Sequence, residues 1–236
     1  MKLLAFDTST ETLSIAVRAG EGAPVLEHTG AGGAQASATL IPALQELLAR
    51  AGLRLQDLDA IAFGRGPGSF TGLRTAAAVA QGLGFGSGVP LLPLGTLLAV
   101  AEEAHAASGA QQVVAMLDAR MGEVYFAGYE RVAGGGWIER QPPSLGPPEA
   151  ASVPQGWTIA GNAIALAPAL WPQAAARVTA LPTARALLRL APQALAAGAG
   201  LAAADALPLY IRDKVAQTTQ ERADDRARKA AGTAGP

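Results

Sequence analysis

The residues best suited to chemistry follow a short apolar strand at the start of the chain. Asp7, Thr8, Ser9 and Thr10 come directly after residues 3–6. A carboxylate at a strand end can bind Mg²⁺, directly or through water, and a tight turn rich in hydroxyl groups can donate to phosphate oxygens. The pattern therefore predicts a phosphate-facing turn. The alternative is that Asp7 caps the turn through its own backbone, as aspartate commonly does.

A glycine-rich run, GRGPGSFTGLR at residues 64–74, lies between an apolar strand and an alanine-rich helix that extends to about Gly84. Glycine lets the backbone come close to a phosphate or to another backbone, because no Cβ stands in the way. We expect Gly66, Gly68 and Ser69 to face the same phosphate as the Asp7 turn.

Familiar catalytic templates do not fit this run. No Gly-Lys-Ser/Thr closes it, and Ser69 and Thr71 stand where a dinucleotide fingerprint needs its last glycine. The chain has two histidines, His28 and His105, which lack metal-ligand spacing, and it has no cysteine. The sequence therefore predicts no catalytic residue and no metal ligand.

Composition favours a folded protein without a general nucleic-acid footprint. Half of the 236 residues are apolar and the formal net charge is −1, so a sizeable core can form and no broad basic surface exists. The apolar stretches are too short for a signal peptide or a membrane span. We expect a cytoplasmic protein with no membrane partner.

A degenerate repeat organises the chain. Apolar strands at 3–6 and 113–117 both end at an aspartate, and a second strand resumes five residues after each aspartate, at Thr12 and at Glu123. Two βαβ-type lobes with matching hairpins explain this pattern. Chance similarity between short strands is the alternative.

Two helices present faces suited to close packing. Residues 40–49 are amphipathic, and small residues recur at every fourth position of the helix that comes after the glycine run. Such a stripe permits a short distance between helices, either in the core or at a subunit interface. The predicted interface comprises Leu40, Leu44, Leu47, Phe70, Gly72, Leu73, Ala76, Ala80 and Gly84.

The second half is less regular. Glycine and proline are frequent in residues 131–157, which predicts an irregular excursion. An alanine-rich helix is expected around 185–197. The polar, mixed-charge residues 216–236 predict a disordered tail.

Four segments resemble the TsaB family: LAFDTST at 4–10, the glycine run with AQGL at 80–83, DARMGEVY at 118–125 and PLYIR at 208–212. That family is the accessory, dimerisation subunit of the bacterial machinery that attaches threonylcarbamoyl to the adenosine just 3′ of the anticodon of certain tRNAs.

The resemblance spans residues 1 to about 215 and implies an α/β protein with the actin-like ATPase fold. It has two ribonuclease-H-like lobes, the second one reduced. The first lobe would comprise residues 1–106, completed by 208–215, and the second lobe residues 107–207.

The resemblance also implies a role. The catalytic relative TsaD holds a metal with paired histidines on the helix after the first hairpin, where this chain has none; Ala36 stands where many TsaB sequences have a single histidine. A non-catalytic scaffold is implied, which binds TsaD through the helices at 40–49 and 70–84 and also meets the ATPase TsaE. It would form a homodimer when alone and reach tRNA only indirectly, through the complex. No cofactor of its own is expected, while MgATP in the complex stays open. The alternative is a nucleotide-dependent enzyme that uses Asp7 and the glycine loop.

Overall fold

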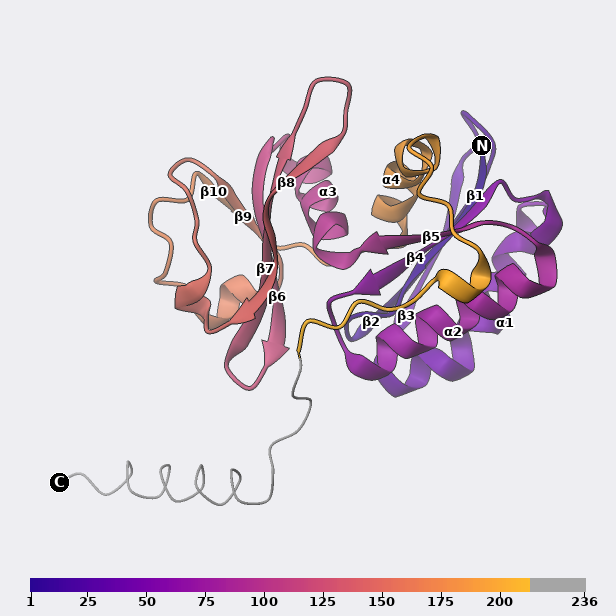
Figure 1. Cartoon of the computed structure of the whole chain (residues 1–236), viewed down its shortest axis with the longest axis horizontal. Coiled ribbons are helices and arrows are strands. Elements are labelled where there is room, and N and C mark those ends of the chain that lie inside the picture. Colours follow the sequence, from indigo (N-terminus) through magenta and orange to yellow (C-terminus); the bar gives the residue numbers. More distant parts are fainter. Residues whose placement is uncertain (213–236) are drawn as a thin grey trace, which may run out of the picture.

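The computed structural model describes residues 1–212, except for the side chain of Ala34. It contains two five-stranded mixed sheets that lie side by side, each with helices packed against it (Figure 1). The predicted tail at 216–236 falls outside the described residues.

The first sheet is built from the N-terminal part of the chain. Its spatial order is β3-β2-β1-β4-β5, in which β1 pairs antiparallel with β2 and parallel with β4. Its strands are β1 (Lys2–Asp7), β2 (Thr12–Ala19), β3 (Val25–Ala31), β4 (Ala60–Gly66) and β5 (Leu91–Gly95).

The second sheet repeats this order. It runs β8-β7-β6-β9-β10, in which β6 pairs antiparallel with β7 and parallel with β9. Its strands are β6 (Gln112–Arg120), β7 (Glu123–Arg131), β8 (Trp137–Gly146), β9 (Thr158–Ala160) and β10 (Ala176–Val178). The repeat predicted from the two aspartate-ended strands is therefore present in the topology.

The helices differ between the two sheets. Helices α1 (Ala36–Arg50) and α2 (Phe70–Ser87) cover one face of the first sheet, and α4 (Ala184–Ala196) covers its other face (Figure 1). Helix α3 (Thr96–Ser108) packs mainly on the second sheet. After β9 comes only the short 3₁₀ helix η4 (Ala163–Leu166), where the first sheet has the long helix α2 after β4. We call the first sheet with α1, α2 and α4 the first lobe, and the second sheet with α3 the second lobe.

Helix α3 lies almost wholly within the predicted first lobe, residues 1–106, and α4 lies within the predicted second lobe, residues 107–207, but each packs on the sheet of the other lobe. Each one follows the strands of one sheet in the chain and packs on the other. The sequence could not show this exchange, because an alanine-rich helix presents a similar apolar face to either sheet.

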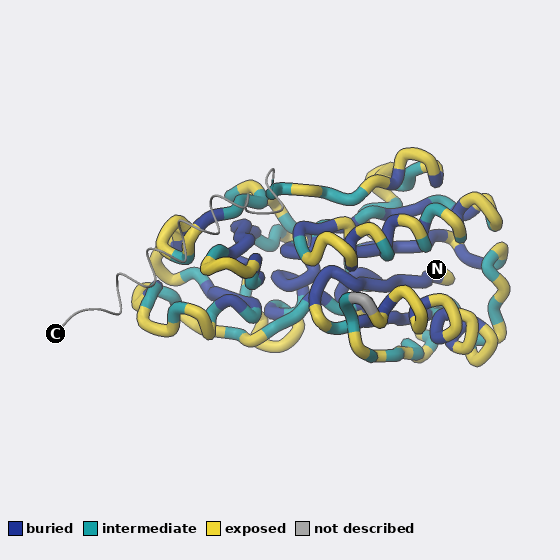
Figure 2. Tube along the Cα trace, turned by 90° about the horizontal axis from the view of Figure 1, so that it is seen from below, coloured by how far each residue is buried: buried dark blue, intermediate teal, exposed yellow. Residues whose placement is uncertain are grey.

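The most continuously buried residues lie on the central strands. Tubes of the central strands are almost continuously buried, while the helices alternate between buried and exposed turns (Figure 2). This alternation is what amphipathic helices on a sheet produce. Within residues 1–212, no helix is both long enough and apolar enough to cross a membrane.

The prediction of an irregular excursion over 131–157 is wrong for its central part. Strand β8 pairs antiparallel with β7 there, at the edge of the second sheet. Its ladder shifts register opposite Gly128, and Pro142 and Pro143 lie at that shift. Proline is tolerated at such a place because an edge strand with a bulge does not need every backbone N–H for pairing.

Candidate functional site

The polar turn after β1 is buried, and its polar side-chain groups other than one Asp7 carboxylate oxygen are bonded within the protein. Asp7 and Thr8 are both fully buried and Ser9 is 2% exposed. The Asp7 carboxylate accepts hydrogen bonds from the backbone N–H of Ser9 at 2.8 Å and from its hydroxyl at 2.6 Å. The hydroxyl of Thr8 donates to the carbonyl oxygen of Gly72 at 2.7 Å. These groups are therefore engaged by the protein itself.

The glycine loop lies directly on this turn. A Cβ atom on Gly72 would stand 1.8 Å from the carbonyl oxygen of Thr8, and one on Gly64 would stand 1.7 Å from Oδ2 of Asp7. A Cβ atom on Gly68 would stand 2.5 Å from the carbonyl oxygen of Ser9. The glycines are required because the loop approaches the chain's own backbone and one buried carboxylate.

Asp7 is electrostatically unusual. Burial raises the pKa of its carboxyl from 3.8 to about 6, although the two hydrogen bonds from Ser9 act in the opposite direction. Its Oδ2 atom is buried and has no hydrogen-bond partner. Such a carboxyl is costly to ionise, because no donor compensates one of its oxygens.

A cavity of about 800 Å³ lies between the lobes, beside this turn. The first lobe lines it with four of the predicted phosphate-facing residues: Ser9, Thr10, Gly68 and Ser69. The other three do not line it: Asp7 and Thr8 are buried, and Gly66 packs against the carbonyl oxygen of Leu209, 2.6 Å from where its Cβ would be. The structure thus divides the predicted site between cavity wall and core.

The second lobe contributes residues that the sequence analysis missed. Asn162 accepts a hydrogen bond from the backbone N–H of Asp118 at 2.9 Å, and both residues line the cavity. Arg120 pairs with Asp118 at 2.9 Å and reaches Glu11 of the first lobe at 3.6 Å. The repeat signals Asp118, and the Gly161-Asn162 pair follows an apolar strand, but the sequence could not show that these two segments meet.

The Asp7 carboxylate is not placed to bind Mg²⁺ in the cavity. Asp7 is fully buried and does not line the cavity, while Glu11 and Asp118, the two acidic residues that do line it, both pair with Arg120. In the part of the chain that the structure describes, no three His, Cys, Asp or Glu side chains are grouped so as to hold a metal ion. A magnesium nucleotide could not be bound through Asp7 without displacing the glycine loop.

The predicted interface residues lie mostly inside the chain. Four of its leucines belong to the buried set of the first lobe, and the small-residue stripe of α2 faces the same chain: a Cβ on Gly84 would meet Leu91 and Ala203 at 3.1 to 3.2 Å. The inference that this stripe meets a second subunit is therefore corrected, because its close neighbours are intramolecular. Only Phe70 of the set is exposed, at 37%. The buried residues concerned are Leu40, Leu44, Leu47, Gly72, Leu73, Ala76, Ala80 and Gly84.

The outward sides of the same two helices carry other apolar side chains. Ile41 on α1 is 44% exposed and Phe85 on α2 is 71% exposed. Together with Phe70, these two residues are the large apolar side chains that α1 and α2 expose to solvent.

Two matching sheets flanking a cavity, each built on a hairpin with a parallel third strand, define a two-lobed α/β protein of the actin-like ATPase type. Comparison with known proteins specifies the family. Residues 32–220 match the family model described as "TsaD: tRNA N6-adenosine threonylcarbamoyltransferase". The Escherichia coli protein named "tRNA threonylcarbamoyladenosine biosynthesis protein TsaB" is 34% identical over 225 residues, which cover 92% of this chain and 96% of that protein.

Two further comparisons agree. A Haemophilus influenzae protein with the same name is 48% identical over 130 residues, 54% of this chain and 53% of its own length. The solved structure "YeaZ from Pseudomonas aeruginosa" superposes with a TM-score of 0.82 at 39% identity and covers 89% of this chain and 99% of that one. The chain belongs to the TsaB family, and its fold is the one that the TsaD family model describes.

Proposed function

We propose that this chain acts in the biosynthesis of threonylcarbamoyladenosine in tRNA, as a non-catalytic subunit that binds and supports the TsaD transferase. Membership of the TsaB family supports the pathway, because relatives in two organisms carry names that state it. Binding to TsaE, a homodimer of the chain alone and an indirect route to tRNA through the complex belong to the same proposal.

The proposal that the chain is non-catalytic rests on one observation: the glycine loop packs directly on the Asp7 turn. Groups that could bind phosphate or metal in a catalytic relative are here bonded to each other and covered by backbone. A catalytic group must be able to reach its substrate. The buried positions of Asp7 and Thr8 therefore favour a supporting role.

The proposed contact with TsaD uses the outward sides of α1 and α2. Phe85 and Ile41 are large apolar side chains exposed on these neighbouring helices. Aromatic anchors of this kind supply much of the binding free energy at protein interfaces. A single charge placed there would weaken the complex without entering the core.

The test measures association of the full chain with purified TsaD by light scattering and calorimetry. Phe85→Asp should weaken binding by at least about tenfold, the effect of losing one interface anchor of more than about 1.4 kcal/mol. Leu166→Asp is the matched control, because Leu166 is 51% exposed but lies on η4 in the second lobe. Absence of a complex with the unaltered chain would overturn the scaffold proposal. Equal affinities for the two variants would overturn the proposed surface.

A nucleotide-dependent enzyme is the competing function, and the interlobe cavity is the observation in its favour. Its volume suits a small-molecule ligand, and Ser9, Gly68 and Ser69 lie on its wall. Calorimetric titration of the chain alone with MgATP separates the two functions. Saturable binding that Asp7→Ala abolishes would favour the enzyme.

A further inference from the structure

The last described residues form an extended segment that crosses from one lobe to the other. We call residues 207–212 the strap; they come after the 3₁₀ helix η5 (Ala203–Asp205) and form one wall of the interlobe cavity (Figure 1). Leu209, Tyr210, Ile211 and Arg212 all line this cavity. The strap is therefore both a link between lobes and a boundary of the space between them.

In the first lobe, the strap is attached to the glycine loop and to the start of α2. The backbone N–H of Leu209 donates to the carbonyl oxygen of Arg65 at 2.7 Å. The Tyr210 ring lies 5.6 Å from the Phe70 ring, and its hydroxyl accepts a hydrogen bond from Nε of Arg74 at 3.2 Å. The guanidinium of Arg74 in turn stacks 3.8 Å from the centre of the Phe70 ring.

In the second lobe, the strap is attached to the tip of the β6–β7 hairpin. Arg212 donates to the carbonyl oxygen of Ala119 at 3.0 Å and pairs with Glu123 at 2.7 Å. Ile211 packs against the apolar cluster between α3 and the second sheet. Each end of this short segment therefore contacts a different lobe.

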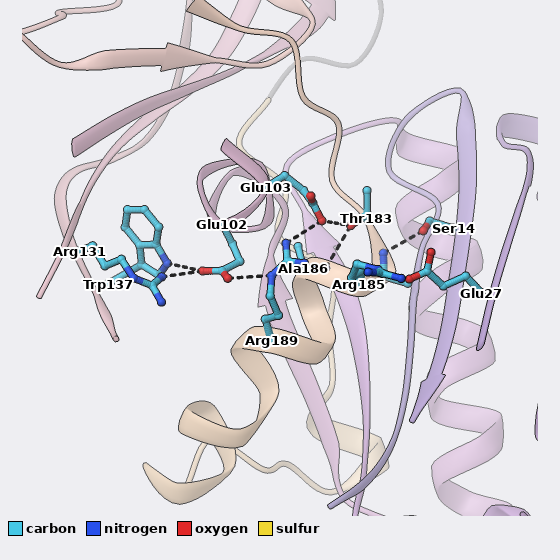
Figure 3. A network of polar contacts seen from close by, with 11 residues as sticks. Ser14, Glu27, Glu102, Glu103, Arg131, Trp137, Thr183, Arg185, Ala186 and Arg189 are labelled. Carbon is cyan, nitrogen blue, oxygen red and sulfur yellow. Dashed lines mark hydrogen bonds and ion pairs between the residues drawn. The ribbon is translucent and has the colours of Figure 1, made fainter. Parts of the chain in front are cut away.

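A second link between the lobes is made by Glu102 of α3 (Figure 3). Its Oε2 accepts hydrogen bonds from Arg131 and Trp137 of the β7–β8 hairpin, both at 2.8 Å. Its Oε1 accepts from Arg189 of α4, at 2.9 Å, and α4 packs on the first sheet. None of these residues lines the interlobe cavity, so the two links are separate. The Arg120–Glu11 pair at 3.6 Å also joins the lobes, but its side chains are 72% and 61% exposed, so it contributes little.

The two links differ in how easily they can break. Glu102 is 4% exposed, and moving Arg189 away would take one of its two arginine partners from a buried carboxylate. The strap relies on groups that water can replace: Tyr210 is 46% exposed, Phe70 is 37% exposed, and the Glu123 side chain is 33% exposed. The Arg212–Glu123 pair is only partly exposed, with the Arg212 side chain at 16%, but solvent screens its Glu123 end and reduces its contribution to stability.

We propose that the strap is a latch on the interlobe cavity: release of its contacts to Ala119 and Glu123 lets the two lobes move apart about the Glu102 link, which stays closed. Thermal motion between lobes is then limited by the weaker link. This property concerns the chain by itself and does not rest on the proposed binding to TsaD.

The test measures the distance between the lobes in the full chain. Because the protein has no cysteine, spin labels can be attached at Ala78→Cys on α2 and Ser152→Cys in the second lobe, both exposed positions. Labelled protein is diluted with unlabelled protein so that distances between chains do not contribute. Arg212→Ala should shift the pulsed-EPR distance distribution to longer values and broaden it.

Arg140→Ala is the matched control, since it removes the same charge and an ion pair, to Glu130, that lies wholly within the second lobe. Its distribution should equal that of the unaltered chain. Glu123→Gln, which leaves the strap sequence intact, should reproduce the shift and decides the matter if Arg212→Ala fails to fold. Unchanged distances in the strap variants, or an equal change in Arg140→Ala, would overturn the proposal.

Discussion

The ends of the two equivalent hairpins have opposite environments. In the first lobe the turn after β1 is sealed, with Asp7 and Thr8 fully buried beneath the glycine loop and α2. In the second lobe the turn after β6 is open, with Met121 61% exposed and the Arg120 side chain 72% exposed. The two aspartates nevertheless make the same local bond, each accepting from the backbone N–H two residues later, at 2.8 Å for Asp7 and 2.7 Å for Asp118.

The difference arises from the helix that comes after the parallel third strand of each sheet. After β4 comes α2, an 18-residue helix whose glycines let it lie on the turn, whereas only the four-residue η4 comes after β9. The local turn is thus common to both lobes, and the covering helix decides whether its carboxylate is fully buried, as in Asp7, or partly exposed, as in Asp118 at 17%. A motif shared by two lobes does not imply a shared function.

The largest effect is expected from a substitution that disrupts the close contact between α2 and the turn after β1. Gly72→Ala places a methyl group 1.8 Å from the carbonyl oxygen of Thr8, where backbone has to move. We expect the free energy of unfolding to fall by about 3 kcal/mol or more, as in severe overpacking. Urea denaturation measures this change.

Gly82→Ala is the control for that substitution. Gly82 lies on the same helix with no neighbour within 4 Å of its Cβ position, so alanine should stabilise by roughly 0.5–1 kcal/mol through helix propensity. Equal destabilisation by both variants would show that the seal is not what makes Gly72 necessary.

The next effect concerns the pH dependence of the sealed carboxylate. Folding raises the pKa of Asp7 from 3.8 to about 6, so the folded state favours the protonated form. The contribution of this group to stability is greatest below pH 4 and is lost as pH rises to about 6. A shift of this size corresponds to roughly 3 kcal/mol.

Asp7→Asn removes that titration. The free energy of unfolding of the variant, measured against the unaltered chain by urea denaturation between pH 4 and pH 7.5, should increase with pH by about 2–3 kcal/mol. A difference that stays constant over this range would contradict the buried, ionisable state of Asp7.

A smaller effect is expected at the open turn. Asp118→Ala removes the acceptor for the backbone N–H of Arg120 and one partner of its guanidinium. Because the turn is exposed, we expect a loss of about 1–2 kcal/mol in stability. Thermal unfolding at neutral pH measures it. A loss larger than that of Gly72→Ala would reverse the proposed ranking of the two turns.

The smallest expected effect is a gain in stability from a substitution in the turn after β6. Met121 has a left-handed backbone with φ of 58°, a conformation that costs a residue with a side chain about 1–2 kcal/mol relative to glycine. Met121→Gly should stabilise the protein by about 0.5 kcal/mol after the entropy cost of glycine. Calorimetry can detect the resulting rise in Tm. A fall would mean that contacts of the methionine side chain outweigh the backbone strain.

The sequence predicted the elements whose pattern is local. Apolar runs closed by aspartate or glycine located β1, β4 and β6, and the spacing after each aspartate located the starts of β2 and β7. The helices after the first hairpin and the glycine loop lie close to their predicted positions. Strand β8 was missed because its prolines are tolerated only at an edge, and strand position in a sheet is not a local property. The predicted phosphate-facing residues are divided between cavity wall and core for the same reason. A glycine run predicts a close approach, but the partner, here the Asp7 turn, depends on the tertiary fold.

The packing of α4 on the first sheet also fixes the order in which the protein can be completed. Residues 2–95 form that sheet, yet the helix that covers its second face begins at Ala184, about 90 residues later. At a synthesis rate of roughly 5–20 residues per second, this apolar face waits several seconds after the sheet has left the ribosome. The first lobe is therefore begun first and finished last, and its half-covered sheet is the segment of the nascent chain most exposed to aggregation.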